Sequence, residues 1–114
     1  MPSSHPRSRY IAFQISLCDS QKDPQFTRND IIHTIQDQCI KRFQTPCKTF
    51  DIYLTRFQHS KGIVRCYHTE KERTTQLLQD ITKIQSVNVH IETLGASGTI
   101  KRCCKKYFMG DPLQ

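Results

Sequence analysis

The sequence is poor in acidic residues and in the residues that break regular structure. Its 114 residues include ten aspartates and glutamates against 17 lysines and arginines, and only four glycines and five prolines. So little glycine and proline excludes a linker or a collagen-like repeat. The sequence also lacks any apolar run near the roughly 18 residues of a membrane-spanning helix, and no signal-peptide h-region follows the N-terminus. We therefore expect an intracellular protein without a membrane span.

The shortage of acids leaves a formal net charge of +7 and an isoelectric point near 9.3. A small domain with this excess typically meets an anionic partner, most often a nucleic acid. A cationic surface that serves only solubility is the alternative. The length suits one domain. Leu, Ile, Val and Phe make up about a quarter of the chain, above the roughly 20% typical of disordered sequences, so we expect a single lean core.

Signatures of a metal site are also missing. No cysteine pair has the CxxC spacing of a zinc site, and no histidine completes a finger-like arrangement. Without a signal peptide the cysteines are expected to be free thiols, and those at apolar-periodic positions are expected to pack in the core. They are Cys18, Cys39, Cys47, Cys66, Cys103 and Cys104. We predict no bound metal.

No local pattern indicates an active site in this chain. Residues 95–99 are rich in glycine but lack the lysine spacing of a Walker loop. No close pair of carboxylates indicates hydrolysis, and no local signature supports a cysteine or histidine nucleophile. We predict no catalytic residue.

Hydrophobic periodicity predicts six elements in the order strand, helix, strand, strand, helix, strand. Thr27 is expected to cap the first helix, close to a capping box with Asp30, and residues 69–72 read as a full capping box for the second helix. The strands are expected over 10–17, 50–57, 63–68 and 87–92, with a hairpin turn over 59–62, and the helices over 28–43 and from the second box to about Ile84. This βαββαβ order is typical of a ferredoxin-like or RRM-like α/β sandwich, an α+β fold with helices on one face of an antiparallel sheet.

A further helix is predicted after the sandwich, over residues 100–108, with its apolar residues on one side and its cations on the other. The cations are Lys101, Arg102, Lys105 and Lys106, and the apolar residues are Ile100, Cys103, Cys104, Tyr107 and Phe108. Cations near a helix N-terminus oppose the helix macrodipole. A phosphate bound by these cations and by N–H groups of the glycine-rich turn over 95–99 would relieve that conflict. A docking helix with an ordinary solvated face is the alternative.

The expected organisation is one domain over residues 10–108, between a flexible basic arm over 1–9 and a short tail over 109–114. This domain comprises the sandwich and the additional C-terminal basic amphipathic helix. The candidate RNA-binding residues are Lys101, Arg102, Lys105, Lys106, Gly98, Thr99, Arg9 and Arg65. Cations of the hairpin such as Arg56 join them if their face of the sheet is open. Tyr10 and Tyr53 could stack bases, although the third strand lacks the aromatic-rich signature of RNA-recognition motifs.

Three segments of the sequence together resemble a known family. They are Arg9-Tyr10-Ile11-Ala12-Phe13, Gly62-Ile63-Val64-Arg65-Cys66 and Gly95-Ala96-Ser97-Gly98-Thr99-Ile100-Lys101-Arg102. In this order and at these separations they resemble the archaeal branch of the Pop-five/Rpp-fourteen family of ribonuclease P and MRP protein subunits. The resemblance runs from about Arg9 to Phe108, and the Ser-Gly-Thr-Ile-Lys stretch is its most specific part. The chain departs from the family in its cysteine content and its short tail.

The resemblance implies an RRM-like sandwich with additional helices and an accessory role in an RNA-based endoribonuclease. In that enzyme the RNA uses Mg²⁺ to remove the 5′ leader from precursor tRNA, so no cofactor is expected on the protein itself. The implied partners are the ribonuclease P RNA and ribonuclease P protein component 3, in a heterodimer or heterotetramer, with precursor tRNA contacted indirectly. The implied location is the cytoplasm of an archaeon, or the nucleus or nucleolus of a eukaryote. The alternatives are a stand-alone single-stranded RNA-binding module that uses the sheet face, and a ferredoxin-like ligand-binding regulatory domain.

Overall fold

The computed structural model describes residues 7–17, 26–58 and 60–110. The expectations for the arm before residue 7, for Cys18 and for the end of the tail lie outside the described residues. Residues 8 and 9, expected in the arm, already belong to the first strand, because Ser8 and Arg9 pair with Tyr67 and Cys66 of another strand.

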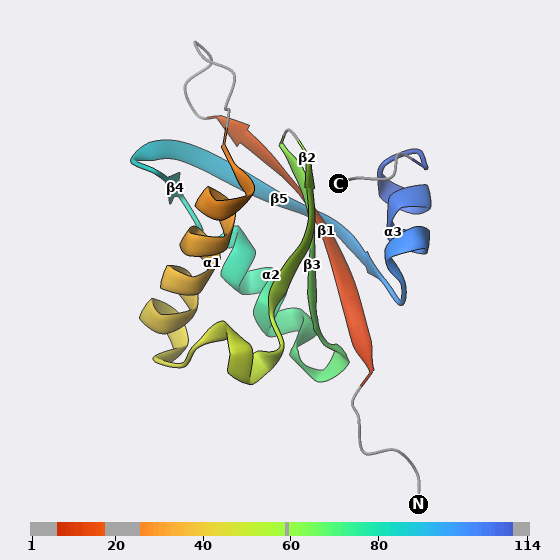
Figure 1. Cartoon of the computed structure of the whole chain (residues 1–114), viewed down its shortest axis with the longest axis horizontal. Coiled ribbons are helices and arrows are strands. Elements are labelled where there is room, and N and C mark those ends of the chain that lie inside the picture. Colours follow the sequence, from red (N-terminus) through yellow and green to blue (C-terminus); the bar gives the residue numbers. More distant parts are fainter. Residues whose placement is uncertain (1–6, 18–25, 59, 111–114) are drawn as a thin grey trace, which may run out of the picture.

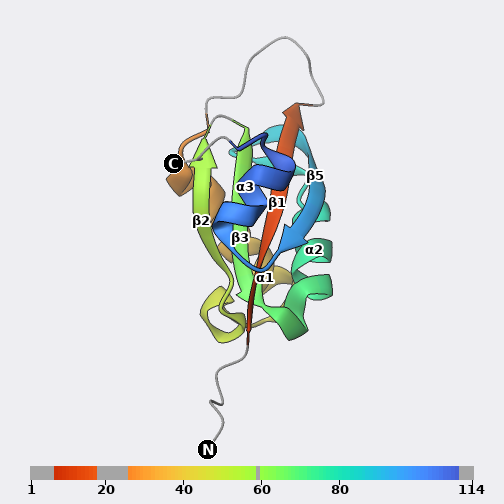
Figure 2. The same cartoon turned by 90° about the vertical axis from the view of Figure 1, so that its right-hand side faces the viewer.

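The described residues form an α+β fold with a five-stranded antiparallel sheet and three α-helices (Figure 1). The sheet order is β2-β3-β1-β5-β4, so the first strand lies in the middle. Helices α1 and α2 cover one face of the sheet, and α3 crosses the other (Figure 2). The elements are β1 (Ser8–Leu17), α1 (Arg28–Phe43), β2 (Tyr53–Gln58), β3 (Lys61–Tyr67), α2 (Lys71–Gln79), β4 (Lys83–Ile84), β5 (Val87–Ser97) and α3 (Ile100–Tyr107), with short 3-10 helices η1 (Cys47–Phe50) and η2 (His68–Glu70).

The sheet is buried on both faces along its central strand, β1. On one face Ile11 and Phe13 pack against α1 and α2 in the main core. On the other face Ala12 is also fully buried, in a smaller cluster under α3. The members of this α3 cluster are Ala12, Ile63, Cys103, Cys104 and Phe108. The chain therefore has a main core and a second, smaller one that holds α3 in place.

The first helix begins and ends where the sequence predicts. The hydroxyl of Thr27 accepts the N–H of Asp30 at 3.2 Å, and the Asp30 carboxylate accepts the N–H of Thr27 at 2.9 Å, so the capping box is complete. After Phe43 the chain turns through Gln44 in the left-handed region, at φ 56°. The cap satisfies N–H groups that an α-helix leaves unpaired at its start.

The second helix differs from its prediction at both ends. Residues 68–70 form η2, and Glu70 precedes α2 without a side-chain cap, so the predicted capping box is wrong. The helix ends at Gln79 because the chain turns to form the β4–β5 hairpin, in which Gln85 and Ser86 have φ values of 51° and 67°. Positive φ at both central residues is typical of a type I′ turn. Ile84, expected on the helix, is buried from β4 instead.

The hairpin over β2 and β3 is confirmed with shifted bounds. Residues 47–50, expected partly as strand, form η1, and Asp51 at φ 54° reverses the chain before β2. The N–H of Ile52 returns to the carbonyl of Cys47 at 3.1 Å, which closes this turn. Lys61 and Gly62, expected in the turn, belong to β3. The local turn therefore overrides the strand-like alternation at residues 50–52.

Substitution of Gly62 by alanine is expected to lower the free energy of unfolding by roughly 1–3 kcal/mol, the usual cost of overpacking a core. A Cβ at this position would overlap the fully buried ring of Phe13, with Cε1 only 2.7 Å away. Urea denaturation measures the change. Gly98→Ala is the control, because its nearest neighbour would be Arg9 Nη1 at an ordinary 3.6 Å. Equal stability of the two variants would contradict the packing assigned to Gly62.

Candidate nucleic-acid interface

Helix α3 follows directly from the end of β5 and begins at a defined cap. The hydroxyl of Thr99 accepts the N–H of Arg102 at 3.1 Å. Cys103 and Cys104 are buried against the sheet, and the thiol of Cys103 contacts the carbonyl of Tyr10 at 3.5 Å. The predicted amphipathic helix is therefore confirmed, ending one residue earlier than expected.

The glycine-rich turn predicted over 95–99 is wrong for its first three residues. Gly95, Ala96 and Ser97 continue β5 and pair with β1. A bulge at Leu94 shifts the register between β1 and β5 just before these three residues. β-bulges commonly change the direction of a strand beside a functional site. Only residues 98–99 connect the strand to α3, and the Arg102 N–H is satisfied by Thr99. Phosphate binding at this connection stays a prediction and depends mainly on side chains.

The cationic side of α3 faces away from the sheet. Its four cations, Lys101, Arg102, Lys105 and Lys106, are all exposed. In the described part of the chain the ion pairs are Arg42–Asp80, Arg65–Asp51 and Arg73–Glu70, and none of them involves a cation of α3. The positive charge of this face is therefore available to an anion.

Two grooves flank α3, and among the described residues that line them none is acidic. The α3–β5 groove is lined by Ala96, Ser97, Gly98, Arg102, Lys105 and Lys106. The α3–β2 groove is lined by Arg56, Ile100, Lys101, Cys104, Lys105, Met109 and Gly110. The guanidinium of Arg9 reaches the first groove, because its Nη1 lies 3.6 Å from the position of a Cβ on Gly98. The structure thus brings six of the eight sequence-predicted residues to one surface, the α3 face, which comprises the two grooves and the exposed cations of α3. The seventh, Thr99, is the exposed N-cap of the same helix.

Arg65, the eighth, is half-buried and is engaged by neighbouring side chains. Its Nη2 pairs with Asp51 Oδ1 at 3.2 Å, and its guanidinium lies 5.1 Å from the ring centroid of Tyr53. The pair is only partly exposed, and the carboxylate neutralises the charge that an RNA phosphate would need. A role of Arg65 in RNA binding stays a prediction.

The base-stacking platform considered from the sequence is covered at Tyr10 but not at Tyr53. Tyr10 packs against the α3 cluster, whereas Tyr53 is 41% exposed beside Arg65. Helix α3 crosses the sheet face on which an RNA-recognition motif stacks bases (Figure 2). The geometry therefore favours α3 and its grooves over the open sheet as the contact surface.

Arg56 and Met109 lie on the α3 face although they were not among the eight candidates. In β2, Leu54 pairs with Val64 but Arg56 pairs with Ile63, so Thr55 is an extra residue. This bulge turns Arg56 to the face that carries α3. No signal in the sequence marks such a bulge, because strand alternation alone would turn Arg56 toward the main core.

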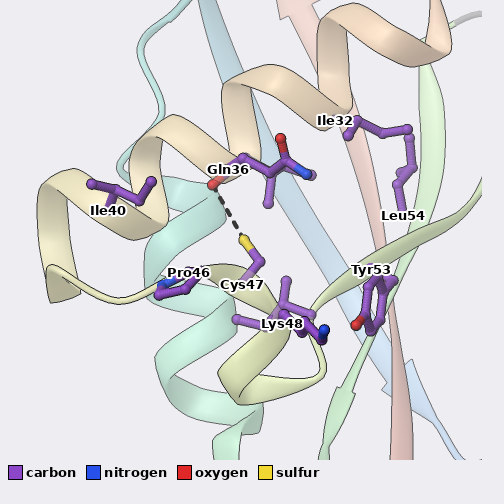
Figure 3. Close-up of a pocket in the computed structure, with 10 residues that line it drawn as sticks. Ile32, Gln36, Ile40, Pro46, Cys47, Lys48, Tyr53 and Leu54 are labelled. Carbon is purple, nitrogen blue, oxygen red and sulfur yellow. Dashed lines mark hydrogen bonds between the residues drawn. The ribbon is translucent and has the colours of Figure 1, made fainter.

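A separate apolar groove lies between α1 and the η1–β2 segment (Figure 3). Ile40 of α1 and Tyr53 of β2 are exposed on it, by 56% and 41%. The thiol of Cys47 donates from its floor to the carbonyl of Ile35 at 3.6 Å. The sequence did not reveal this surface, since Ile40 falls outside the apolar stripe of its helix.

The cysteines of the described residues are free and buried, as predicted: Cys39, Cys47, Cys66, Cys103 and Cys104. Burial raises the pKa of Cys66, and it raises the pKa of Cys103 to about 11. A hydrogen bond between the thiols of Cys39 and Cys47 lowers the pKa of Cys39 and raises the pKa of Cys47. Within residues 7–17, 26–58 and 60–110, no three side chains of the metal-binding types cluster. These thiols therefore act as packing groups.

No helix in the described part of the chain is long and apolar enough to cross a bilayer.

Comparison with known proteins identifies relatives over most of the chain. The model of the Rpp14/Pop5 family matches residues 9–108. Ribonuclease P protein component 2 of Archaeoglobus fulgidus is 32% identical over 106 residues, which cover 93% of both chains. Its namesake in Methanosarcina barkeri is 29% identical over 114 residues and 94% of this chain, or 76% of its own length. A chain in the cryo-EM structure of yeast ribonuclease MRP shares the fold with a TM-score of 0.69 at 9% identity, over 86% of this chain and 79% of that one.

Proposed function

The chain belongs to the Rpp14/Pop5 family and is a protein subunit of ribonuclease P, and we propose that it acts there as an RNA-binding accessory subunit. In this role it supports the catalytic RNA while that RNA removes the 5′ leader from precursor tRNA. The observation that carries the proposal is the α3 face, where four exposed cations lie beside Arg9 and the described residues that line the two flanking grooves include no acid. Such a face binds the phosphate backbone and releases its counterions.

The order of the strands supports the finer assignment of the fold. The four longer strands follow one another as β2-β3-β1-β5, all antiparallel, with α1 and α2 on one face. We assign this arrangement to the ferredoxin-like sandwich, with α3 as an addition on the other face.

The chemical step belongs to the RNA in this proposal. The Mg²⁺ that the reaction uses is held by the RNA in this proposal. The protein supplies positive charge where folded RNA strands approach one another. Its cations lower the electrostatic cost of that approach.

We propose ribonuclease P protein component 3 as the protein partner. The apolar groove of Figure 3, with its exposed Ile40 and Tyr53, supports a protein contact because exposed apolar surface of this kind marks interaction sites. No residue of α3 lines this groove, so a protein bound there leaves the cationic face to the RNA. The archaeal sources of the matching relatives support the cytoplasm of an archaeon as the location.

Reconstitution of precursor-tRNA cleavage tests the proposed function. The RNA and the remaining protein components are mixed with and without this chain, and release of the 5′ leader is followed at limiting Mg²⁺. Omission is expected to slow cleavage by about tenfold or more, equivalent to ~1.4 kcal/mol or more in activation free energy. Added Mg²⁺ is expected to restore part of the rate, since it screens the same phosphates. An unchanged rate in the otherwise complete mixture would contradict the proposal.

A further inference from the structure

The α3–β2 groove is lined by both apolar and cationic side chains. Ile100 and Met109 contribute apolar surface, and Arg56, Lys101 and Lys105 contribute positive charge. The groove has a volume of about 1020 Å³, at the upper limit of the roughly 300–1,000 Å³ of small-ligand sites. A ligand that fits it must therefore offer an apolar body and negative charge together.

Arg56 reaches this groove only because β2 is irregular. The extra residue at Thr55 moves Arg56 opposite Ile63, whose side chain belongs to the α3 cluster. The bulge is fixed by the Thr55 hydroxyl, which donates to the carbonyl of Ile63 at 3.0 Å. Bulges that re-aim one side chain are common beside functional sites. The bulge thus interrupts the regular pairing of β2 and brings Arg56 to the groove that Lys101 and Lys105 of α3 also line.

Met109 lines the same groove and has an unusual backbone conformation. Its φ is 56°, in the left-handed region that residues other than glycine rarely adopt. The N–H of Gly110 returns to the carbonyl of Cys104 at 2.9 Å and holds the chain in this reversal. Met109 is 98% exposed. A large apolar side chain held in solvent beside a cationic groove suits contact with a ligand.

We propose that the α3–β2 groove binds an unpaired nucleotide of RNA, a site that deepens the proposed function and rests on it. The base lies over Ile100 and Met109, and the flanking phosphates meet Arg56, Lys101 and Lys105. A paired base is stacked within its helix, so the ligand is a looped-out or single-stranded residue. An acidic amphipathic peptide has a similar character. RNA fits better because the cations continue around α3 into the α3–β5 groove, as a backbone track requires.

Two exposed positions allow a test that leaves the fold intact. Binding of the full chain to a short single-stranded RNA and to a duplex of the same length is measured by fluorescence anisotropy over a range of salt. Met109→Ala is expected to weaken single-strand binding about fivefold or more, with little effect on the duplex. Arg56→Ala is expected to weaken it too and to lower the salt slope by about 0.7. Val87→Ala and Lys83→Ala are the matched controls, exposed and outside both grooves.

The outcomes separate this site from the general proposal. A photo-crosslink from a 5-iodouridine oligonucleotide to the peptide that contains Met109 would support the nucleotide site. If Met109→Ala and Arg56→Ala bind the single strand like the unmodified chain, the nucleotide site is wrong, while loss of binding on removal of the α3 cations would still uphold RNA binding by α3. If the two variants keep RNA binding but lose a probe peptide of alternating glutamate and leucine, the groove docks protein and the proposal is also overturned.

Discussion

Replacement of Lys101, Arg102, Lys105 and Lys106 by alanine is expected to weaken binding to ribonuclease P RNA by roughly 300-fold at 0.15 M salt. Each phosphate contact contributes about 0.7–0.9 to the slope of log K against log salt, so the loss of four contacts lowers the slope by about 3. Between 1 M and 0.15 M salt that change corresponds to the stated loss. A salt titration of binding, by filter retention or anisotropy, measures both quantities.

Stability is expected to hold in this variant. The two cations in the first turn of α3 oppose the macrodipole, and alanine is a better helix former than either. A matched variant in which Lys41, Lys48, Lys71 and Lys83 become alanine removes the same charge from exposed positions outside α3. It is expected to change the slope far less. Equal slopes for the two variants would show that net charge alone attracts the RNA and would contradict the assignment to α3.

Substitution of Gly95 by alanine is expected to release α3 from the sheet. A Cβ at Gly95 would overlap the ring of Tyr107, with Cε1 2.7 Å away, and the φ of 155° is rarely adopted by other residues. Overpacking and backbone strain together are expected to lower the free energy of unfolding by roughly 2–5 kcal/mol. Urea denaturation measures the loss. Alkylation by iodoacetamide reports the undocking, because Cys103 and Cys104 are shielded in the native chain.

A double variant distinguishes a local clash from general damage. Removal of the ring by Tyr107→Ala in the Gly95→Ala background is expected to recover part of the stability, which a double-mutant cycle would record as coupling between the two positions. If Gly95→Ala keeps full stability and shielded thiols, the close approach of β5 to α3 has no energetic role.

Features of the fold that depend on neighbours within one turn of helix could be predicted from the sequence. The box between Thr27 and Asp30 set the start of α1, and the 3.6-residue period of α3 separated its cations from its buried cysteines. The end of α2 could not be read in this way. Ile84 has helical spacing from the buried residues before it, and only its pairing with Val87 in a two-residue hairpin shows that it belongs to a strand.

The candidate site could be predicted from the sequence only in part, and the part that could be predicted is also local. Its cations lie on one short helix, so a single periodicity reveals them. Arg56 joins them through a bulge in a different strand, and Gly95 belongs to β5 through pairing with Ala12. Such long-range pairing leaves no local signature. Arg65 looked equivalent to the other cations until the structure placed Asp51 beside it.

The position of β1 also bears on the order in which the protein is made. This strand is synthesised first, yet its two neighbours in the sheet are β3 and β5, and β5 ends at Ser97. The centre of the sheet therefore cannot form until β3 and β5 have emerged from the ribosome, as in other folds of high contact order. Helix α3 docks on Ala12 and Ile63 and comes later still. A nascent chain without this helix lacks the α3 face, so recognition of the RNA follows synthesis of the helix.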